Sequence, residues 1–301
     1  MAHPQCFPQR NCSNNGKMPT PLLVNPVRAD TFECKGIQSI LSVIKDHLSF
    51  EGELLRFSAV DIHDFEYLAS EDTRPLKSMK LGYSFSDRYL TIRMPGFAHE
   101  ILSGLFKQIV DEQLCAMRVS REIIPCASPL TVIGQRAKEP DACWLSKATG
   151  SLKVVVEVGA SESARQLAID ARGWVETPST TVERCITINL TNDSDLVLEV
   201  WKLGPRVYPL RSRNLLPSAL VTQHIEITHQ ASGPQIRGWS LDDTLTSQFS
   251  DEIRIEFDTI LGRPPGNSQE ADIVCNKDML SEFAATFWDS QERHLRTLAS
   301  Q

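Results

Sequence analysis

The sequence predicts an α/β protein, because helical and strand-like patterns alternate along a chain of ordinary globular composition. Hydrophobic residues make up 41% and charged residues 23% of the 301 residues, which excludes wholesale disorder and a fibrous protein. The two strongest patterns are an apolar stripe at helical spacing near residues 98–115 and a pair of strand-like runs between residues 139 and 159.

Five prolines and four asparagines without apolar periodicity predict that residues 1–30 form a flexible tail. Residues 31–301 are then expected to form a single domain. Apolar residues at helical spacing predict a short amphipathic helix over Ile37–Leu48. The segment YSFSDRYLTIRM, residues 83–94, alternates apolar and polar positions, which predicts one half-buried strand that ends at Pro95.

The apolar residues of Ala98–Cys115 recur every three to four positions, so an amphipathic helix is expected there, with Glu100 in its first turn. The segments EPDACWL and SLKVVVEVG flank the turn-like SKATG and predict an antiparallel hairpin. If the turn centres near Thr149, paired residue numbers sum to 298 (141 plus 157). Asp141 then pairs with Glu157 on one face of the sheet.

The rest of the chain continues the α/β order. Ser161–Ser163 are typical of a helix cap, and the apolar positions of Leu167–Val175 predict the helix that follows. Further strands are expected at RCITINL, DLVLEVWKL and IRIEFDTIL, and a C-terminal helix is expected within ADIVCNKDMLSEFAATFWDSQ.

Charge and cysteine usage exclude several classes. A net charge of −7 argues against an indiscriminate polyanion binder, so any nucleic-acid contact must be local. The eight cysteines form no CxxC pair, which argues against a structural zinc site and predicts mostly reduced, buried thiols. No apolar run reaches eighteen residues and the N-terminus lacks a secretory pattern. We therefore expect an intracellular protein, cytoplasmic or nuclear, with no membrane partner.

Asp141 and Glu157 are the candidate metal ligands. Two carboxylates about 5 Å apart repel by roughly 3 kcal/mol at an effective dielectric near 20, and a divalent cation removes that cost. Mg²⁺ or Mn²⁺ suits such hard oxygen ligands, and the carbonyl of Val158 would add a backbone oxygen. A metal held there would polarise a phosphate and lower the pKa of a bound water, the usual chemistry of phosphodiester hydrolysis.

The order of these features resembles the PD-(D/E)XK nuclease superfamily over roughly residues 83–200. The segments RYLTIRMP and VVVEVGASES look most like bacterial proteins classed as restriction endonucleases and their uncharacterised fungal relatives. The resemblance implies a restriction-endonuclease-like core, a mixed central sheet flanked by helices, followed by a C-terminal extension. It also implies hydrolysis of DNA, with residues that stand here as His99-Glu100, Pro140-Asp141 and Glu157: Asp141 and Glu157 as catalytic metal ligands and Glu100 assisting.

One position departs from this pattern. The family places a lysine two residues after the second acid, where this chain has Gly159. Some members carry the charge on the following helix instead, where Arg165, Gln166 and Arg172 are available here. Arginine stays protonated and cannot act as a general base, so water activation would fall to the metal. We therefore expect weakened cleavage, and replacing Gly159 with Lys is a direct test.

Other roles for these residues remain open. The alternative function is a catalytically degenerate nuclease fold that binds nucleic acid or protein, and a third is a purely structural or interaction protein. Asp141 also suits a turn cap, and Glu157 a solvent-facing position. His99 suits an exposed first-turn residue, while Glu100 suits either the helix dipole or a third ligand position.

A basic strip is the candidate nucleic-acid contact. No acidic residue stands between Glu199 and Glu226, and a solvated loop that balances the acidic remainder is an equally good interpretation. The phosphate-contacting candidates in this strip are Lys202, Arg206, Arg211 and Arg213. A homo-oligomer is also compatible with the sequence.

Overall fold

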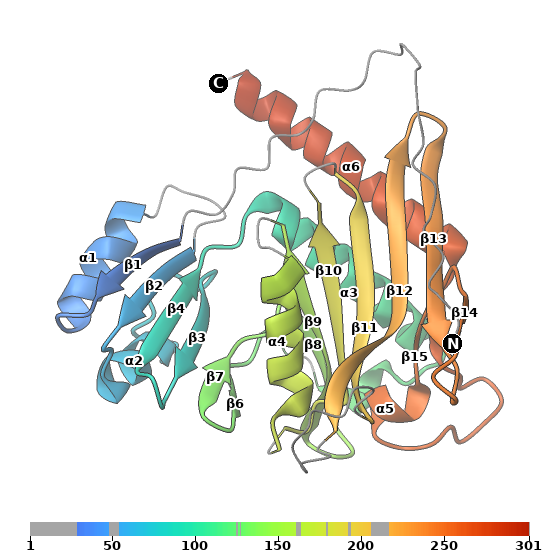
Figure 1. Cartoon of the computed structure of the whole chain (residues 1–301), viewed down its shortest axis with the longest axis horizontal. Helices are drawn as coiled ribbons and strands as arrows, with labels where there is room; N and C mark the ends of the chain where they lie inside the picture. Colours follow the sequence, from blue (N-terminus) through green and yellow to red (C-terminus); the bar gives the residue numbers. More distant parts are fainter. Residues whose placement is uncertain are drawn as a thin grey trace, which may run out of the picture.

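The structure, a computed structural model, describes residues 29–47, 54–124, 126, 128–160, 164–178, 180–191, 194–205 and 217–300. The described residues form a six-stranded sheet, an eight-stranded sheet and a small two-stranded sheet. Figure 1 shows the two large sheets side by side, with a helix near their junction. The α/β class predicted from the sequence is confirmed at this level.

The six-stranded sheet has the order β1-β2-β4-β3-β7-β6, with β1 parallel to β2 and the other neighbours antiparallel. Helices α1 (Ile37–His47) and α2 (Ile62–Ala69) share its hydrophobic core. The strands are β1 (Ala29–Glu33), β2 (Leu54–Ser58), β3 (Lys80–Ser84), β4 (Tyr89–Arg93), β6 (Thr131–Ile133) and β7 (Arg136–Lys138).

Alternation along these strands separates two faces. In β4, Leu90 and Ile92 are fully buried in the core, whereas Thr91 and Arg93 line a pocket on the opposite side. The prediction of one continuous strand over residues 83–94 is wrong. A turn at residues 85–88 separates β3 from β4, and Arg88 in this turn has a positive φ of 53°.

The eight-stranded sheet has the order β14-β13-β12-β11-β10-β9-β8-β5. Only β9 and β10 are parallel neighbours in it. Its strands are β5 (Ile123–Ile124), β8 (Ala142–Ser146), β9 (Ser151–Gly159), β10 (Arg184–Leu190), β11 (Leu196–Gly204), β12 (Ser218–Gln230), β13 (Gly233–Leu241) and β14 (Ser247–Phe249).

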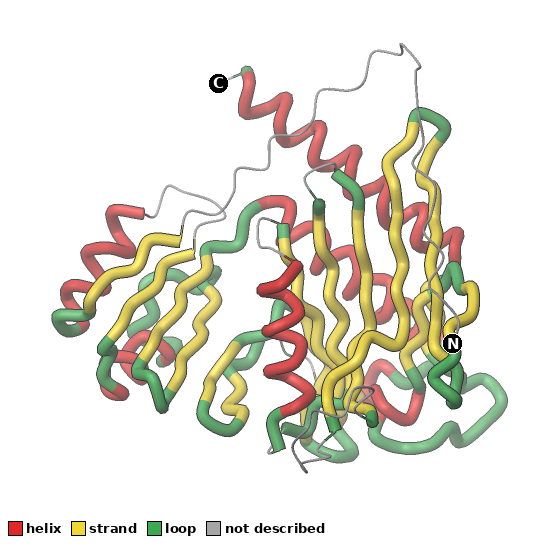
Figure 2. Tube along the Cα trace, viewed as in Figure 1, coloured by secondary structure: helices red, strands yellow, loops and turns green. Residues whose placement is uncertain are grey.

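Helices cover both faces of this sheet, as Figure 2 shows. Helices α3 (Phe97–Ala116) and α6 (Lys277–Ala299) pack on one face, and α4 (Ala164–Glu176) packs on the other. The remaining elements are the 3₁₀ helix Ser120–Glu122, β15 (Ile253–Ile255), α5 (Phe257–Leu261) and β16 (Ile273–Cys275).

Strand β9 is buried on both faces, which explains its nearly continuous apolar sequence. Val154, Val156 and Val158 belong to the core under α3 and α6, and Val155 packs with Trp174 of α4. The predicted hairpin is confirmed, since Ala142 pairs with Val156 and the backbone N–H of Asp141 donates to the carbonyl of Val156 at 3.0 Å. This register sets Asp141 opposite Glu157.

The predicted helices over Ile37–Leu48 and Ala98–Cys115 and at the C-terminus are confirmed. Two boundaries need correction. Residues 29 and 30, expected in the tail, belong to β1, and residues 1–28 lie outside the described residues. The segment IRIEFDTIL is not one strand, because β15 ends at Ile255 and α5 follows.

The two large sheets have separate hydrophobic cores, and the segment 83–200 contributes to both. A restriction-endonuclease-like core therefore stays a prediction. Among the described cysteines, Cys143, Cys185 and Cys275 are buried as expected, whereas Cys115 is exposed and Cys34 and Cys126 are partly buried. None of the helices in the described part of the chain has the length and apolarity needed to cross a membrane.

Candidate functional site

Asp141 is buried just before β8 and faces three donors. Its Oδ2 accepts a hydrogen bond from the backbone N–H of Val158 at 2.7 Å. The same oxygen lies 3.0 Å from Nε2 of His99 and 3.7 Å from Nη1 of Arg93. Its Oδ1 is also buried but has no hydrogen-bond partner among the described residues. A buried carboxylate oxygen without a partner is rare, which makes Asp141 a candidate ligand-binding group.

Glu157, in the middle of β9, has an exposed fraction of 0%. Its Oε1 accepts a hydrogen bond from the indole N–H of Trp174, and its Oε2 lies 3.0 Å from Nζ of Lys138. The alternative of a solvent-facing Glu157 is therefore wrong, because its face of β9 is covered by α4. The charge of Asp141 is among the groups that act on the pKa of Glu157, so the two carboxylates share one local environment.

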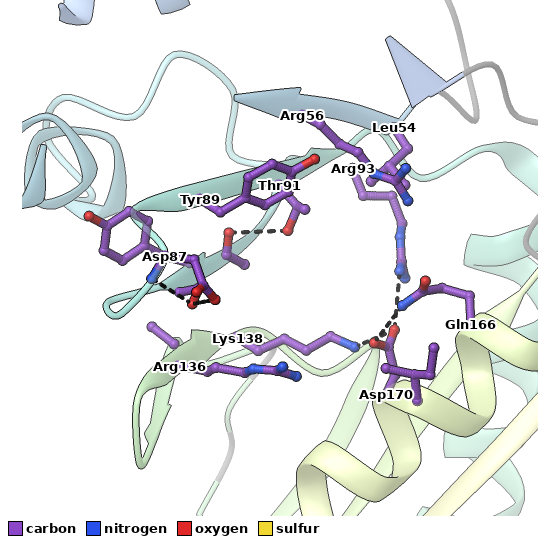
Figure 3. Close-up of a pocket in the computed structure, with 15 residues that line it drawn as sticks. Leu54, Arg56, Asp87, Tyr89, Thr91, Arg93, Arg136, Lys138, Gln166 and Asp170 are labelled. Atoms are coloured by element: carbon purple, nitrogen blue, oxygen red, sulfur yellow. Dashed lines mark hydrogen bonds and ion pairs between the residues drawn. The ribbon is translucent and has the colours of Figure 1, made fainter. Parts of the chain in front are cut away.

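Asp170 on α4 joins these two acids. Its Oδ2 lies 2.7 Å from Nζ of Lys138 and 3.7 Å from Nη2 of Arg93, and its Oδ1 accepts from Gln166 at 3.1 Å. Figure 3 shows Lys138, Arg93 and Gln166 converging on Asp170. Residues 166, 170 and 174 are spaced by four, which places them on one face of α4, toward β9.

We call these residues the ion-pair cluster: the acids Asp141, Glu157 and Asp170 with the partners Arg93, His99 and Lys138. The network runs from Asp141 through Arg93 to Asp170, and from Asp170 through Lys138 to Glu157. Residues from both large sheets, α3 and α4 therefore meet at one point.

The cluster shifts three pKa values. Burial opposes ionisation of Asp141, but His99, Arg93 and the Val158 N–H hold its pKa well below the ordinary value. Burial raises the pKa of Glu157 to about 7, although Lys138 acts in the opposite direction. Burial also lowers the pKa of Lys138, but Asp170 and Glu157 outweigh it and raise that pKa above its ordinary value. Lys138 is therefore a firmly protonated cation beside Asp170 and Glu157.

Lys138 places an amine beside Glu157, whereas the sequence pattern offered no lysine near Gly159. A Cβ at Gly159 would lie 2.6 Å from Cδ1 of Leu167, so any side chain at this position requires Leu167 to move. The lysine comes instead from β7 of the neighbouring sheet. Lys138 stands three residues before Asp141, and that proximity was the only sequence signal for it.

The other predicted site residues lie in different places. His99 contacts Asp141 and is buried rather than exposed, while Glu100 has a side chain that is 59% exposed and lies 4.0 Å from His99. Gln166 reaches the cluster through Asp170, whereas Arg165 and Arg172 are exposed on α4. The contact from Val158 to Asp141 is made by its N–H.

The predicted basic strip is not part of this site where it is described. Lys202 lies on β11, where its charge acts on Glu256. Arg206, Arg211 and Arg213 lie outside the described residues, as do the predicted cap residues Ser161–Ser163.

The cluster opens on a pocket of about 460 Å³ between the polar face of the six-stranded sheet and α4. Arg93, Lys138 and Asp170 belong both to the cluster and to the pocket lining. A solvent-accessible cavity next to buried, perturbed acids is the usual form of a binding site. We call this cavity the sheet–α4 pocket.

Comparisons of the chain with protein-family models, curated proteins and solved structures found no match.

The acids of the ion-pair cluster have an oxygen that suits a divalent ion, but each acid already has a cationic or imidazole partner. No group of three or more His, Cys, Asp or Glu side chains in the described part of the chain is placed to hold a metal. Mg²⁺, however, is usually held by one or two protein carboxylates, with water and substrate phosphate completing its shell. The unpaired Oδ1 of Asp141 is an oxygen of the kind that such an ion requires.

Proposed function

We propose that this protein is a metal-dependent nuclease that hydrolyses phosphodiester bonds of DNA, and that it is a member of the PD-(D/E)XK superfamily. The observation that carries the proposal is the position of Lys138, 3.0 Å from Glu157 and 2.7 Å from Asp170, in the cluster that also contains the unpaired oxygen of Asp141. A divalent ion, two carboxylates and a lysine are the components that the resemblance requires, and Lys138 supplies the one that the sequence had lacked.

Each residue has a distinct role in this proposal. Asp141 and Glu157 hold Mg²⁺ or Mn²⁺, which supplies polarisation of the phosphate and of a bound water. Lys138 orients the water and offsets developing negative charge, since a protonated amine with a raised pKa cannot serve as a general base. Arg93 lines the sheet–α4 pocket and offsets charge on the phosphate. Trp174 positions Glu157 by donating to it.

The test is cleavage of supercoiled plasmid and of single-stranded circular DNA in Mg²⁺ or Mn²⁺ by wild type, Lys138→Met and Asp141→Asn. We expect both variants to lose about 10²-fold or more of the wild-type rate. Lys147→Met is the matched control, because Lys147 is exposed in the turn between β8 and β9. Wild-type cleavage rates in Lys138→Met, with the protein folded by circular dichroism, would contradict the proposed role.

One observation favours a second candidate, a nuclease-like fold that binds nucleic acid without cutting it. Every acid of the cluster already has a cationic or imidazole partner within the chain, so the site is compensated without a metal. Isothermal titration with Mg²⁺ and Mn²⁺ separates the two candidates. Divalent binding that is lost in Asp141→Asn favours the nuclease, whereas nucleic-acid binding without divalent binding favours the second candidate.

A further inference from the structure

The polar face of the six-stranded sheet presents side chains in rows across its strands. Arg56 on β2 pairs with Thr91 on β4, Thr91 pairs with Gly82 on β3, and Gly82 pairs with Lys138 on β7. Thr91 and Gly82 form the floor between the two cations, because Thr91 Oγ1 donates to the Gly82 carbonyl at 3.1 Å and Gly82 adds no side chain. The row is thus hollow in the middle and cationic at both ends.

A second row runs beside the first. Tyr89 on β4 pairs with Ser84 on β3, and Ser84 pairs with Arg136 on β7. Arg56, Tyr89 and Arg136 all line the sheet–α4 pocket. Figure 3 shows Arg56 and Arg136 on opposite sides of the pocket, with Lys138 next to Arg136.

The side chains of Arg56 and Arg136 have no hydrogen bond or ion pair with other described residues, unlike those of Arg93 and Lys138. The pocket also contains Asp170 and Asp87, but Asp170 is paired with cluster cations and Asp87 accepts from Ser84 at 2.6 Å. The charged residues of the lining are four cations, Arg56, Arg93, Arg136 and Lys138, and two acids, so the cavity has an excess of positive charge in a chain of net charge −7. Guanidinium groups suit phosphate oxygens, which they bind in a fixed fork geometry.

We propose that the sheet–α4 pocket takes an unpaired stretch of a polynucleotide strand, with Arg56 and Arg136 binding phosphates on either side of the one at the cluster. This inference rests on the proposed nuclease function and names its substrate class. A cavity of about 460 Å³ is of the size that takes one nucleotide unit, so the neighbouring units of the strand would extend past it on either side. A nucleotide of a duplex is paired and stacked, so it would have to leave the helix before it entered such a cavity. Tyr89 supplies an aromatic surface for a base.

The experiment measures binding rather than cleavage. Fluorescence anisotropy in EDTA uses a labelled 12-nucleotide single-stranded DNA, its RNA equivalent and the blunt-ended DNA duplex of the same sequence. The proteins are wild type, Arg56→Gln, Arg136→Gln and the double variant. Arg237→Gln is the matched control, because Arg237 is exposed on β13 and loses the same charge. Thermal unfolding verifies that each variant is folded.

We expect a single strand, of DNA or RNA, to bind at least tenfold more tightly than the duplex. Each arginine variant should weaken that binding about tenfold and reduce the slope of log K against log salt by about 0.7, one phosphate contact on a single strand. A purely structural role for these arginines would not change the salt slope. Arg237→Gln should bind as wild type.

Equal or tighter binding of the duplex, wild-type binding by the double variant, or no oligonucleotide binding by wild type would each overturn the inference. Failure of this inference and failure of the proposed nuclease function give different results. Cleavage without any effect of Arg56→Gln or Arg136→Gln would leave the nuclease proposal standing and remove the pocket from it. If single-strand binding needs both arginines but the protein never cleaves, the pocket inference stands and the nuclease proposal fails.

Discussion

Glu139 and Asp141 stand on either side of Pro140 and are both buried, but their carboxylates have different surroundings. Glu139 accepts from both terminal nitrogens of Arg74, at 2.6 and 2.7 Å, and from the backbone N–H of Leu81 at 2.8 Å. Asp141 receives all of its contacts at Oδ2 and keeps Oδ1 without a hydrogen-bond partner among the described residues.

This difference separates a structural ion pair from a candidate site. Each oxygen of Glu139 accepts from one bidentate arginine, so neither is left without a partner, and the contacts of Glu139 tie β3 to the end of β7. Asp141 lies beside a cavity with one free acceptor. Burial alone does not distinguish these two acids. The unpaired oxygen does.

The largest effect that we expect is on stability, and it tests whether Glu139 forms a structural ion pair. Glu139→Gln leaves the buried guanidinium of Arg74 without its charge partner, which should lower the free energy of unfolding by about 3–5 kcal/mol. Urea unfolding followed by circular dichroism measures this change. Glu66→Gln, on the exposed surface of α2, is the control and should stay within about 0.5 kcal/mol of wild type.

Glu139→Gln also tests whether Glu139 takes part in divalent-ion binding. Folded Glu139→Gln protein should bind divalent ions with wild-type affinity, because Glu139 does not contact the ion-pair cluster. Unchanged stability, or divalent affinity that falls as far as in Asp141→Asn, would show that the two acids do not have separate roles.

The hairpin and its two acids were predictable because their signals are local. The turn-like SKATG fixes the register, and the register sets Asp141 opposite Glu157. Lys138, Arg93 and Asp170 were not predictable as site residues. Lys138 and Arg93 reach the cluster from short strands of a different sheet, and Asp170 is one polar position on an amphipathic helix. Such contacts depend on how the two sheets pack against each other, and a short sequence pattern does not predict that packing.

We expect an intermediate effect of pH on the free energy of unfolding, because the pKa of Glu157 in the ion-pair cluster is raised to about 7. Folded protein holds the proton of Glu157 up to about pH 7, whereas the unfolded chain releases it near its ordinary pKa of 4.5. The free energy of unfolding should therefore fall as pH rises between these values, by on the order of 3 kcal/mol, and stay level above them. Asp141 acts oppositely, and its stabilisation is lost as pH falls through its lowered pKa.

Urea unfolding at intervals from pH 4 to 8 measures how the free energy of unfolding depends on pH. Glu157→Gln should remove the fall in this free energy between pH 4.5 and 7. A divalent ion must displace the same proton, so its affinity should rise about tenfold per pH unit up to about pH 7 and then level off. A wild-type minus Glu157→Gln difference that is flat across this range would contradict the assignment of Glu157 as a group that is protonated near neutrality.

The smallest effect concerns the position where the family pattern has lysine. Gly159 is buried on β9, and an added Cβ would lie 2.6 Å from Cδ1 and 3.0 Å from Cγ of Leu167. Gly159→Ala should therefore cost about 1–3 kcal/mol of stability, the usual range for overpacking a filled core. Gly104→Ala is the control of opposite sign. Nothing lies within 4 Å of a Cβ at Gly104 in α3, so that change should stabilise the protein by about 0.5–1 kcal/mol through helix propensity.

The same geometry decides what Gly159→Lys will do. A lysine there must displace Leu167 and then compete with Lys138 for Glu157, which already has a cation at 3.0 Å. We expect Gly159→Lys to lower stability at least as much as Gly159→Ala and to leave any cleavage rate unchanged or lower. A rise in cleavage in Gly159→Lys that persists in Lys138→Met would show that Lys138 does not hold the lysine's role. It would also return that role to the position that the sequence pattern first indicated.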